Sequence, residues 1–143
     1  MKLPEYAPVT PQVAEELASL VGKGNLALQR DKCEAYSYDE VERHFWHRDY
    51  CAEAVIFPET TEEVASVMRY ANAHRIPVTP RGAGTGLSGG AVPACGGIVL
   101  SLEKMNRILE VDPHNLTLTA EPGVITAEIN RAAGKEGLFY AGD

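Results

Sequence analysis

Apolar positions recur with helical spacing near the start of the chain. Thr10 can cap a helix, Pro11 suits a first helical position, and apolar residues follow three or four positions apart up to Gly22. The spacing predicts an amphipathic helix over residues 11–21. In residues 23–52 polar and aromatic residues mix without a sustained period, so we expect irregular structure there.

A strand, a helix and a second strand are predicted next. Residues 54–58 are apolar and β-prone, and Thr60 and Glu63 can form a capping box at the start of a helix. The apolar residues on one face of that helix are Val64, Val67, Met68 and Ala71. Residues 76–80 favour a second strand, expected to run parallel to the first after a right-handed crossover. Together these segments predict a βαβ unit.

Further strands, a hairpin and a last helix complete the pattern. Residues 97–102 favour a third strand, and residues 107–111 and 116–121 flank an Asp-Pro turn and should pair as a hairpin. Its predicted buried face carries Leu116, Leu118 and Ala120. Thr126 opens a helix that stops near Gly137. The predicted fold class is α+β.

Glycine is concentrated between the second and third strands. Seven of the 13 glycines fall within residues 82–97. Glycine permits positive φ and lets backbone N–H groups approach a ligand, so residues 81–90 have the parts of a diphosphate cradle. Thr85 and Ser88 add hydroxyl donors, and Arg81 could serve the site or brace the loop. The alternative is a surface loop or flexible linker, but open α/β sheets place ligands directly after such a strand.

Two common nucleotide-binding motifs do not fit this segment. Residues 84–89 match G-x-G-x-x-G, and Glu110 supplies a carboxylate about 20 residues further on. A Rossmann site needs a helix that begins at this turn, and residues 89–97 leave no room for one. A P-loop is excluded because no Gly-Lys-Ser/Thr follows. A diphosphate held by loop backbone alone remains.

Charge and cysteine content narrow the possible functions. The 13 basic and 20 acidic residues give a formal charge of -7, so we expect no nucleic-acid partner, and any anionic ligand needs a local site. No transmembrane segment or signal peptide is recognisable, which favours a cytoplasmic protein. Cys33, Cys51 and Cys95 lie far apart and predict reduced, partly buried thiols.

The aromatic and histidine residues before the first strand admit several interpretations. His44, His47 and Cys51 could be metal ligands, but no second cluster completes a four-ligand set. A half-buried patch of aromatic and histidine side chains is favoured, and no metal is expected. Phe45 and Trp46 could stack on an adenine, although packing against the N-terminal helix is the preferred interpretation.

Several segments carry a resemblance to a known family. They are residues 54–58 followed by 61–64, residues 77–90, and residues 121–124. From Ala54 to Asp143 the chain resembles FAD-linked oxidases with a PCMH-type (vanillyl-alcohol-oxidase-type) FAD-binding domain, in particular glycolate oxidase flavoprotein subunits and D-lactate dehydrogenases. The resemblance implies a PCMH-type fold in an incomplete domain. Residues 1–52 would be an N-terminal helical and irregular segment, and residues 53–143 the N-terminal part of a truncated FAD-binding domain.

The resemblance also implies a cofactor and its ligands. Several relatives attach the flavin covalently through a histidine that would fall at Thr85, so non-covalent FAD is implied here. The glycine-rich loop would wrap the pyrophosphate, and the turn at residues 122–123 would lie near the flavin. The implied cofactor-binding residues are Pro80, Arg81, Gly82, Ala83, Gly84, Thr85, Gly86, Leu87, Ser88, Pro122 and Gly123.

The implied reaction is oxidation of a 2-hydroxy acid, of the glycolate or D-lactate type, to the 2-oxo acid with hydride transfer to FAD. Catalytic residues would lie beyond residue 143, so the isolated chain should be inactive. Implied partners are the substrate and either the missing C-terminal half or an iron–sulfur electron-transfer subunit, and partners could hold the cytoplasmic protein at the inner membrane. A stand-alone nucleotide-binding module and a ligand-free fragment without activity remain as alternatives.

Overall fold

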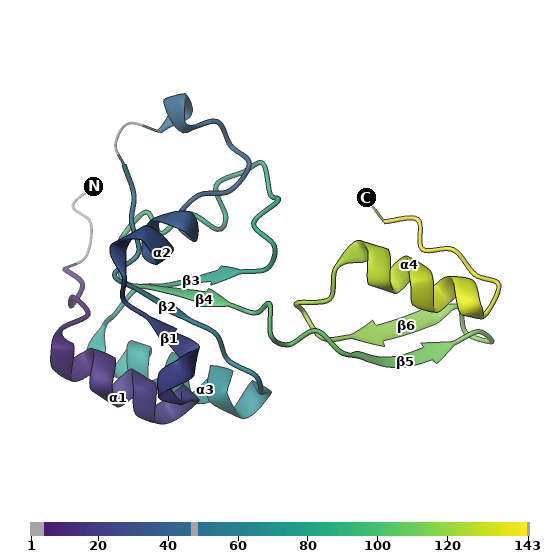
Figure 1. The fold of residues 1–143 in the computed structure, drawn as a ribbon, viewed down its shortest axis with the longest axis horizontal. Coiled ribbons are helices and arrows are strands. Elements are labelled where there is room, and N and C mark those ends of the chain that lie inside the picture. The colour runs from purple at the N-terminus through teal and green to yellow at the C-terminus, as the bar shows by residue number, and fades with distance from the viewer. Residues whose placement is uncertain (1–4, 47–48, 143) are drawn as a thin grey trace.

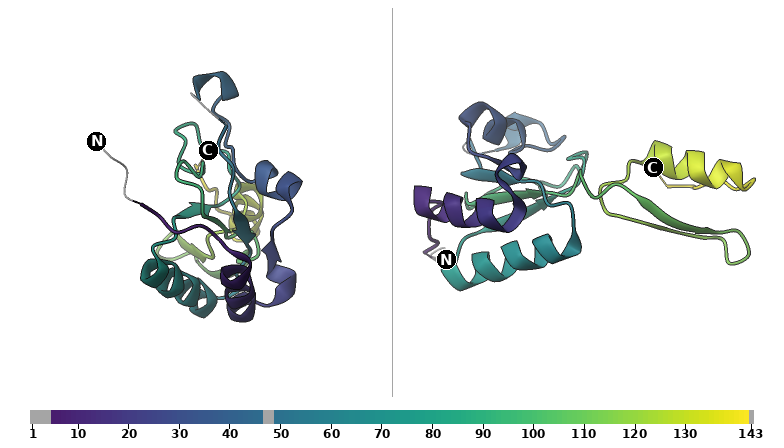
Figure 2. Two further views of the ribbon diagram at one scale, coloured as in Figure 1. Left: turned by 90° about the vertical axis from the view of Figure 1, so that its left-hand side faces the viewer. Right: turned by 60° about the horizontal axis from the view of Figure 1, so that its bottom comes forward.

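The chain folds into a larger and a smaller lobe joined by a narrow neck (Figure 1). This computed structural model describes residues 5–46 and 49–142. The larger lobe contains a four-stranded sheet with helices on both faces, and the smaller lobe contains a two-stranded hairpin covered by one helix (Figure 2). This mixture of elements confirms the predicted α+β class.

The four-stranded sheet has the order β1-β2-β4-β3. Its strands are β1 (Leu26–Ala27), β2 (Ala54–Ile56), β3 (Val78–Arg81) and β4 (Ile98–Ser101). Both β2 and β3 pair in parallel with β4, so the predicted parallel βαβ unit is confirmed, with β4 inserted between its two strands. Pro80 lies on the edge strand β3, where a residue without an N–H can be accommodated.

Both faces of the sheet are buried, which explains the uninterrupted apolar runs of β2 and β4. On one face Ile56 and Ile98 pack against helices α1 (Pro11–Val21) and α3 (Thr61–His74). On the other face Val55 and Val99 share a cluster with Cys33 of α2 (Arg30–Ala35). Burying one such aliphatic side chain contributes about 1.5–3 kcal/mol, so two sides of packing fix the sheet.

The N-terminal helix α1 matches its prediction, but the region after it does not. The Thr10 hydroxyl accepts a hydrogen bond from the Val13 N–H at 3.3 Å, and α1 ends before Gly22. The prediction of irregular structure for residues 23–52 is wrong in part, because this region contains β1, α2 and two 3-10 turns. These turns are η1 (Lys23–Asn25) and η2 (Arg43–Phe45). Elements of two to six residues are too short to display a period and are held by tertiary packing.

Helix α3 is capped as its sequence indicates, with one difference. The Thr60 hydroxyl accepts from the Glu63 N–H at 3.1 Å, whereas the Glu63 carboxylate accepts from the N–H of Glu59 at 2.6 Å rather than from Thr60. Val67 is buried, but Met68, predicted on the buried face, is 44% exposed. Met68 follows Val67 directly and is therefore rotated about 100° away from the core.

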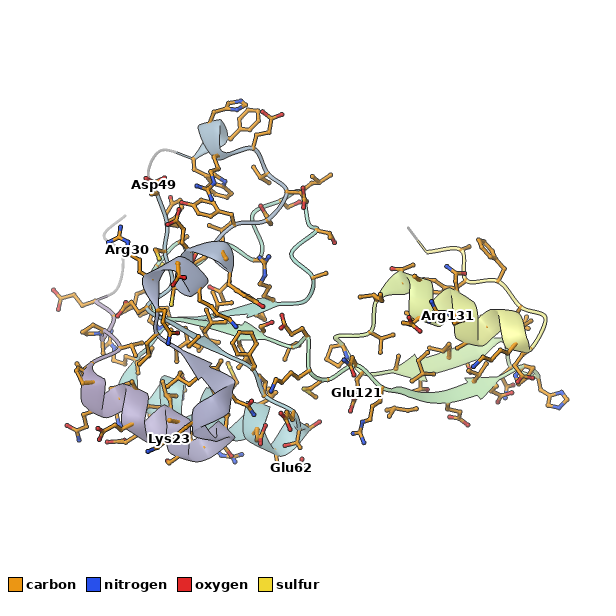
Figure 3. All side chains as sticks on the ribbon, in the orientation of Figure 1. Lys23, Arg30, Asp49, Glu62, Glu121 and Arg131 are labelled. Carbon is orange, nitrogen blue, oxygen red and sulfur yellow. The ribbon has the colours of Figure 1, made fainter. Side chains whose placement is uncertain are left out.

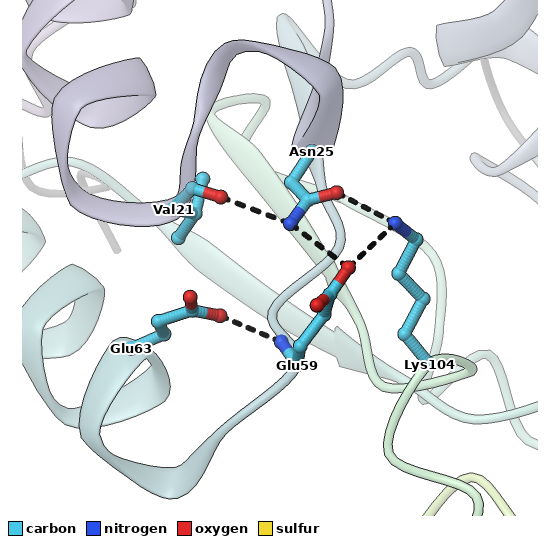
Figure 4. A network of polar contacts seen from close by, with 5 residues as sticks. All are labelled: Val21, Asn25, Glu59, Glu63 and Lys104. Atoms are coloured by element: carbon cyan, nitrogen blue, oxygen red, sulfur yellow. Dashed lines mark hydrogen bonds and ion pairs between the residues drawn. The ribbon is translucent and has the colours of Figure 1, made fainter.

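A polar network joins three segments on the outside of the larger lobe (Figure 4). The Lys104 ammonium donates to Asn25 Oδ1 at 2.6 Å and to Glu59 Oε1 at 2.9 Å. The Asn25 amide in turn donates to the Val21 carbonyl and to Glu59. The Lys104 and Asn25 hydrogen bonds hold the pKa of Glu59 below its ordinary value. The network fastens the end of α1 to the turn that follows β4.

The smaller lobe confirms the predicted hairpin and last helix. Its elements are β5 (Ile108–Asp112), β6 (Thr117–Ala120) and α4 (Thr126–Lys135). The turn is fixed by the Asp112 carboxylate, which accepts from the backbone N–H groups of His114 and Asn115. Leu118 and Ala120 are half-buried as expected, but Leu116 is 72% exposed. Leu116 has a φ of 54° in the turn, which removes it from the strand alternation.

Arg107 and Glu121 form an ion pair at the neck, where the hairpin of the smaller lobe begins and ends. Glu121 is labelled in Figure 3. The Glu121 carboxylate accepts from the Arg107 backbone N–H at 2.8 Å, from its Nε at 3.0 Å and from its Nη2 at 2.6 Å. The Glu121 side chain is 10% exposed, and the Arg107 hydrogen bonds lower its pKa. The ionised carboxylate therefore ties the start of β5 to the end of β6.

We expect acid to loosen this neck. A lowered pKa means that the stabilisation is complete above the ordinary glutamate pKa of about 4.3 and is lost as the pH falls through the lower folded-state value. The protection of the β5 and β6 amides against hydrogen exchange, relative to their intrinsic rates at each pH, should fall in that range, and Glu121→Gln should remove this pH-dependent loss. The exposed Glu110 on the same hairpin is the matched control, since Glu110→Gln should keep the full response. An unchanged profile in Glu121→Gln would contradict the assignment.

The cysteines differ in environment. Cys33 is buried, and burial is the main cause that raises the pKa of its thiol. Cys51 and Cys95 are exposed free thiols, so the prediction of partly buried thiols is wrong for both. They lie in loops that flank the sheet, where the sequence carries no periodic burial signal. Within the described part of the chain, no helix has the length and apolar character required to cross a bilayer.

Candidate cofactor site

The glycine-rich loop connects two parallel neighbours of the sheet. It leaves the carboxyl end of β3 after Arg81 and returns to the first residue of β4 at Ile98. Residues 82–97 are all described by the structure, and they form bends and turns without any helix, which agrees with the argument against a Rossmann site. The loop therefore lies at the carboxyl ends of the parallel strands, where open α/β sheets bind ligands.

The loop has the backbone conformation for which glycine is suited. Gly84, Gly89, Gly96 and Gly97 have φ values between 71° and 76°. At Gly84 a Cβ atom would lie 2.1 Å from Nη2 of Arg81, so a side chain there would be strained by the positive φ and would displace the Arg81 guanidinium. The concentration of glycine in the sequence thus reflects a specific local shape.

The first part of the loop, residues 82–90, has backbone N–H groups without a partner in the described part of the chain. Among the described residues, no N–H group from Gly82 to Gly90 donates a hydrogen bond to another protein group. The side chains of Thr85 and Ser88 are exposed on the same loop. Successive unpaired N–H groups in a tight, glycine-rich turn are the donor set that binds phosphate oxygens. The loop can therefore accept an anionic ligand without rearranging its hydrogen bonds.

The segment that supports this loop is not indicated by any pattern in the sequence. We call residues 36–46 the strap, because three of its residues contact Arg81 or the loop that follows it. The Tyr38 carbonyl accepts from Arg81 Nη1 at 2.6 Å, and the Glu40 N–H donates to the Gly86 carbonyl at 3.1 Å. The third contact is made by Trp46, whose indole ring lies against Gly89. The strap lies about 45 residues before the loop in sequence, so no local pattern indicates these contacts.

The aromatic residues of the strap correct two predictions. Trp46 packs on the loop, and on Tyr50 with ring centroids 5.6 Å apart, rather than on the N-terminal helix. Phe45 is 67% exposed, and its ring contacts the exposed His44, so the expected half-buried patch is absent at these two described residues. The ribbon of Figure 1 shows η2, which contains His44 and Phe45, at the end of the larger lobe away from the sheet.

A metal site receives no support from the described residues. His47, one of the considered ligands, lies outside them. Within the described ranges, no group of three or more histidine, cysteine, aspartate or glutamate residues could hold a metal ion.

Beneath Arg81 lies an ordered set of polar groups. The Tyr36 hydroxyl donates to Glu103 at 2.9 Å, and the Ser101 hydroxyl donates to the same carboxylate oxygen at 3.0 Å. Burial, followed by the hydrogen bond to Glu103, raises the pKa of Tyr36, so its hydroxyl stays protonated. The Arg81 guanidinium carbon lies 5.5 Å from the centre of the Tyr36 ring. These hydrogen bonds hold the Tyr36 ring in place next to Arg81, the residue that precedes the loop.

The Pro122–Gly123 turn lies in the neck. The Gly123 N–H donates to the Met105 carbonyl at 2.8 Å, and a Cβ atom at Gly123 would lie 2.1 Å from the Leu102 carbonyl oxygen. The Leu102 N–H in turn donates to the Arg81 carbonyl at 2.8 Å. Backbone contacts therefore connect the turn to Arg81, the last residue of β3 before the glycine-rich loop.

Comparison with known proteins decides the family. The sequence model of the family described as "FAD binding domain" matches residues 52–143. The chain belongs to this family. Glycolate oxidase subunit GlcD of Bacillus subtilis (strain 168) is 40% identical over 135 residues, which are 94% of this chain and 28% of that protein. A D-lactate dehydrogenase of Anaerostipes hadrus is 37% identical over 145 residues, with 97% of this chain and 28% of that protein covered.

The fold of this FAD binding domain chain also occurs in solved structures. The structure of p-cresol methylhydroxylase with substrate bound has a TM-score of 0.76 at 24% identity and covers 89% of this chain and 25% of that one. The resemblance to PCMH-type FAD-linked oxidases and the predicted fold are thus confirmed. The chain spans about 28% of the length of the curated relatives described above.

Proposed function

We propose that this chain is the FAD-binding portion of a flavin-dependent oxidoreductase that oxidises a 2-hydroxy acid to the 2-oxo acid. The observation that carries the proposal is the glycine-rich loop after β3, where nine successive backbone N–H groups (residues 82–90) donate to no group among the described residues. Membership of the FAD binding domain family and the similarity to a glycolate oxidase subunit and a D-lactate dehydrogenase support it.

The residues of the loop fit the diphosphate of FAD. We assign residues 80–88 to the pyrophosphate, with backbone N–H groups as the main donors and the Thr85 and Ser88 hydroxyls as additional ones. Threonine at position 85 offers no imidazole for a covalent flavin bond, so the cofactor is bound non-covalently. We assign Pro122 and Gly123 to the flavin side of the site, because backbone contacts link them to the start of the loop.

Bound FAD would supply the two-electron acceptor for the oxidation, and the role of this chain is to bind and orient it. We place the substrate-binding and catalytic groups, and the contacts to an electron-transfer partner, in the part of a complete enzyme that this chain does not cover. Glycolate and D-lactate are the substrate types suggested by the relatives. We further propose a cytoplasmic location.

Titration of FAD tests the proposal directly. We expect saturable quenching of flavin fluorescence, competition by ADP, and no turnover of glycolate or D-lactate by the isolated chain. FMN, which lacks the diphosphate, should compete much more weakly. Equal competition by FMN and ADP would contradict a diphosphate cradle, and absence of any FAD binding at millimolar concentration would favour a ligand-free fragment.

A further inference from the structure

We propose that Arg81 is a positioning residue, whose guanidinium holds the glycine-rich loop in its phosphate-receiving shape and does not itself ligate the phosphates. This inference deepens the proposed function and rests on it for the identity of the ligand. It makes the strap, residues 36–46, a structural part of the cofactor site.

The contacts of Arg81 are those of a brace. Its Nη1 donates to the Tyr38 carbonyl at 2.6 Å, which links the end of β3 to the strap. A Cβ atom at Gly84 would lie 2.1, 2.2 and 2.5 Å from Nη2, Cζ and Nη1, so the guanidinium packs directly against the Gly84 backbone. One side chain thus contacts the strap and the first turn of the loop, at Gly84.

The shape of the guanidinium matters for this role. Arginine presents a planar group with several fixed donors, whereas lysine presents a compact ammonium on a flexible stem. A planar group can lie flat against Gly84 while one nitrogen bonds to the Tyr38 carbonyl. Lysine would retain the positive charge but could not maintain both contacts. Charge and shape can therefore be separated by substitution.

The other strap contacts act in the same direction. The Glu40 N–H donates to the Gly86 carbonyl, and Trp46 lies against Gly89, so the strap contacts the loop at two positions after Thr85 as well as Arg81 before it. The Arg81 end is anchored from below, because the Leu102 N–H donates to the Arg81 carbonyl. With the loop restrained in this way, its N–H groups need not be ordered when a ligand binds, which lowers the entropic cost of binding.

Arg81→Lys and Arg81→Met test the proposal, with Arg69→Met on the exposed face of α3 as the control. Trp46 is the one tryptophan of the chain and contacts the loop, so its emission reports the strap–loop contact without any ligand. Both Arg81 variants should shift unliganded Trp46 emission to longer wavelength and increase its quenching by acrylamide. Both should also raise the FAD dissociation constant by roughly tenfold to a hundredfold, the range for losing a hydrogen bond from a charged group.

The outcomes separate a brace from a phosphate ligand. If Arg81→Lys binds FAD nearly as well as the native chain, the charge is what matters, and the proposal is overturned. Unchanged Trp46 emission in both variants overturns it too, even if FAD binding is lost. Because the emission measurement needs no cofactor, it decides the bracing role even if the native chain binds no FAD, a result that would reject the proposed function separately.

Discussion

Gly84→Val should abolish detectable FAD binding while leaving the sheet and helices folded. Gly84 has a φ of 76°, which β-branched residues rarely adopt, and its new side chain would collide with the Arg81 guanidinium. Relieving the collision requires the loop to change shape or Arg81 to leave the Tyr38 carbonyl. The loop is exposed and outside the apolar core, so unfolding stability should change little. We expect at least about a hundredfold weaker binding by flavin fluorescence, with circular dichroism unchanged.

Two glycine variants provide controls for this result. Gly24→Ala lies outside the loop, with open space around its Cβ position and no positive φ, so it should bind FAD normally. Gly86, which lies inside the loop, also has open space around its Cβ position and no positive φ. The Trp46 emission of unliganded Gly86→Ala should therefore match that of the native chain. Any loss of affinity in Gly86→Ala would then report the closeness of the ligand rather than the shape of the loop. Normal FAD affinity in Gly84→Val would refute the cradle.

Much of this architecture could be predicted because its signals are local. The Thr10 and Thr60 hydroxyls cap helices at the positions that their sequence context indicates. The apolar run of β2 and the turn at Asp112 define a buried strand and a hairpin. Each of these features depends on residues within a few positions of one another, which is the range over which capping and turn chemistry act.

The missed features depend on contacts between distant segments. β1 consists of two residues and exists because Leu26 and Ala27 pair with β2, which no periodicity could reveal. The role of Arg81 could not be assigned from sequence, since its partner carbonyl lies 43 residues earlier. A backbone carbonyl is present at every residue, so no side-chain pattern marks Tyr38 as the acceptor. For the same reason the glycines predict a special loop shape but not the strap that supports it.

Gly97→Ala should have the opposite effect to Gly84→Val and destabilise the fold itself. Gly97 has a φ of 72°, and a Cβ atom there would lie 2.4 Å from the Pro77 carbonyl oxygen, which accepts the N–H of Ile98. The Gly97 carbonyl also accepts hydrogen bonds from the N–H groups of Glu53 and Ala54. We expect the free energy of unfolding, measured with urea, to fall by about 3 kcal/mol, since strain and a backbone collision add.

Comparing Gly97→Ala with Gly84→Val separates an effect on the stability of the fold from an effect on FAD binding. Such a loss is a large share of the roughly 5–15 kcal/mol that stabilises a domain, so Gly97→Ala should lower the folded fraction at modest temperature. FAD binding should then fall only in proportion to the folded fraction, whereas Gly84→Val loses binding in a folded chain. A Gly97→Ala variant as stable as Gly24→Ala would show that the loop can re-enter β4 by another path. The positive φ of Gly97 would then not be what positions the loop on the sheet.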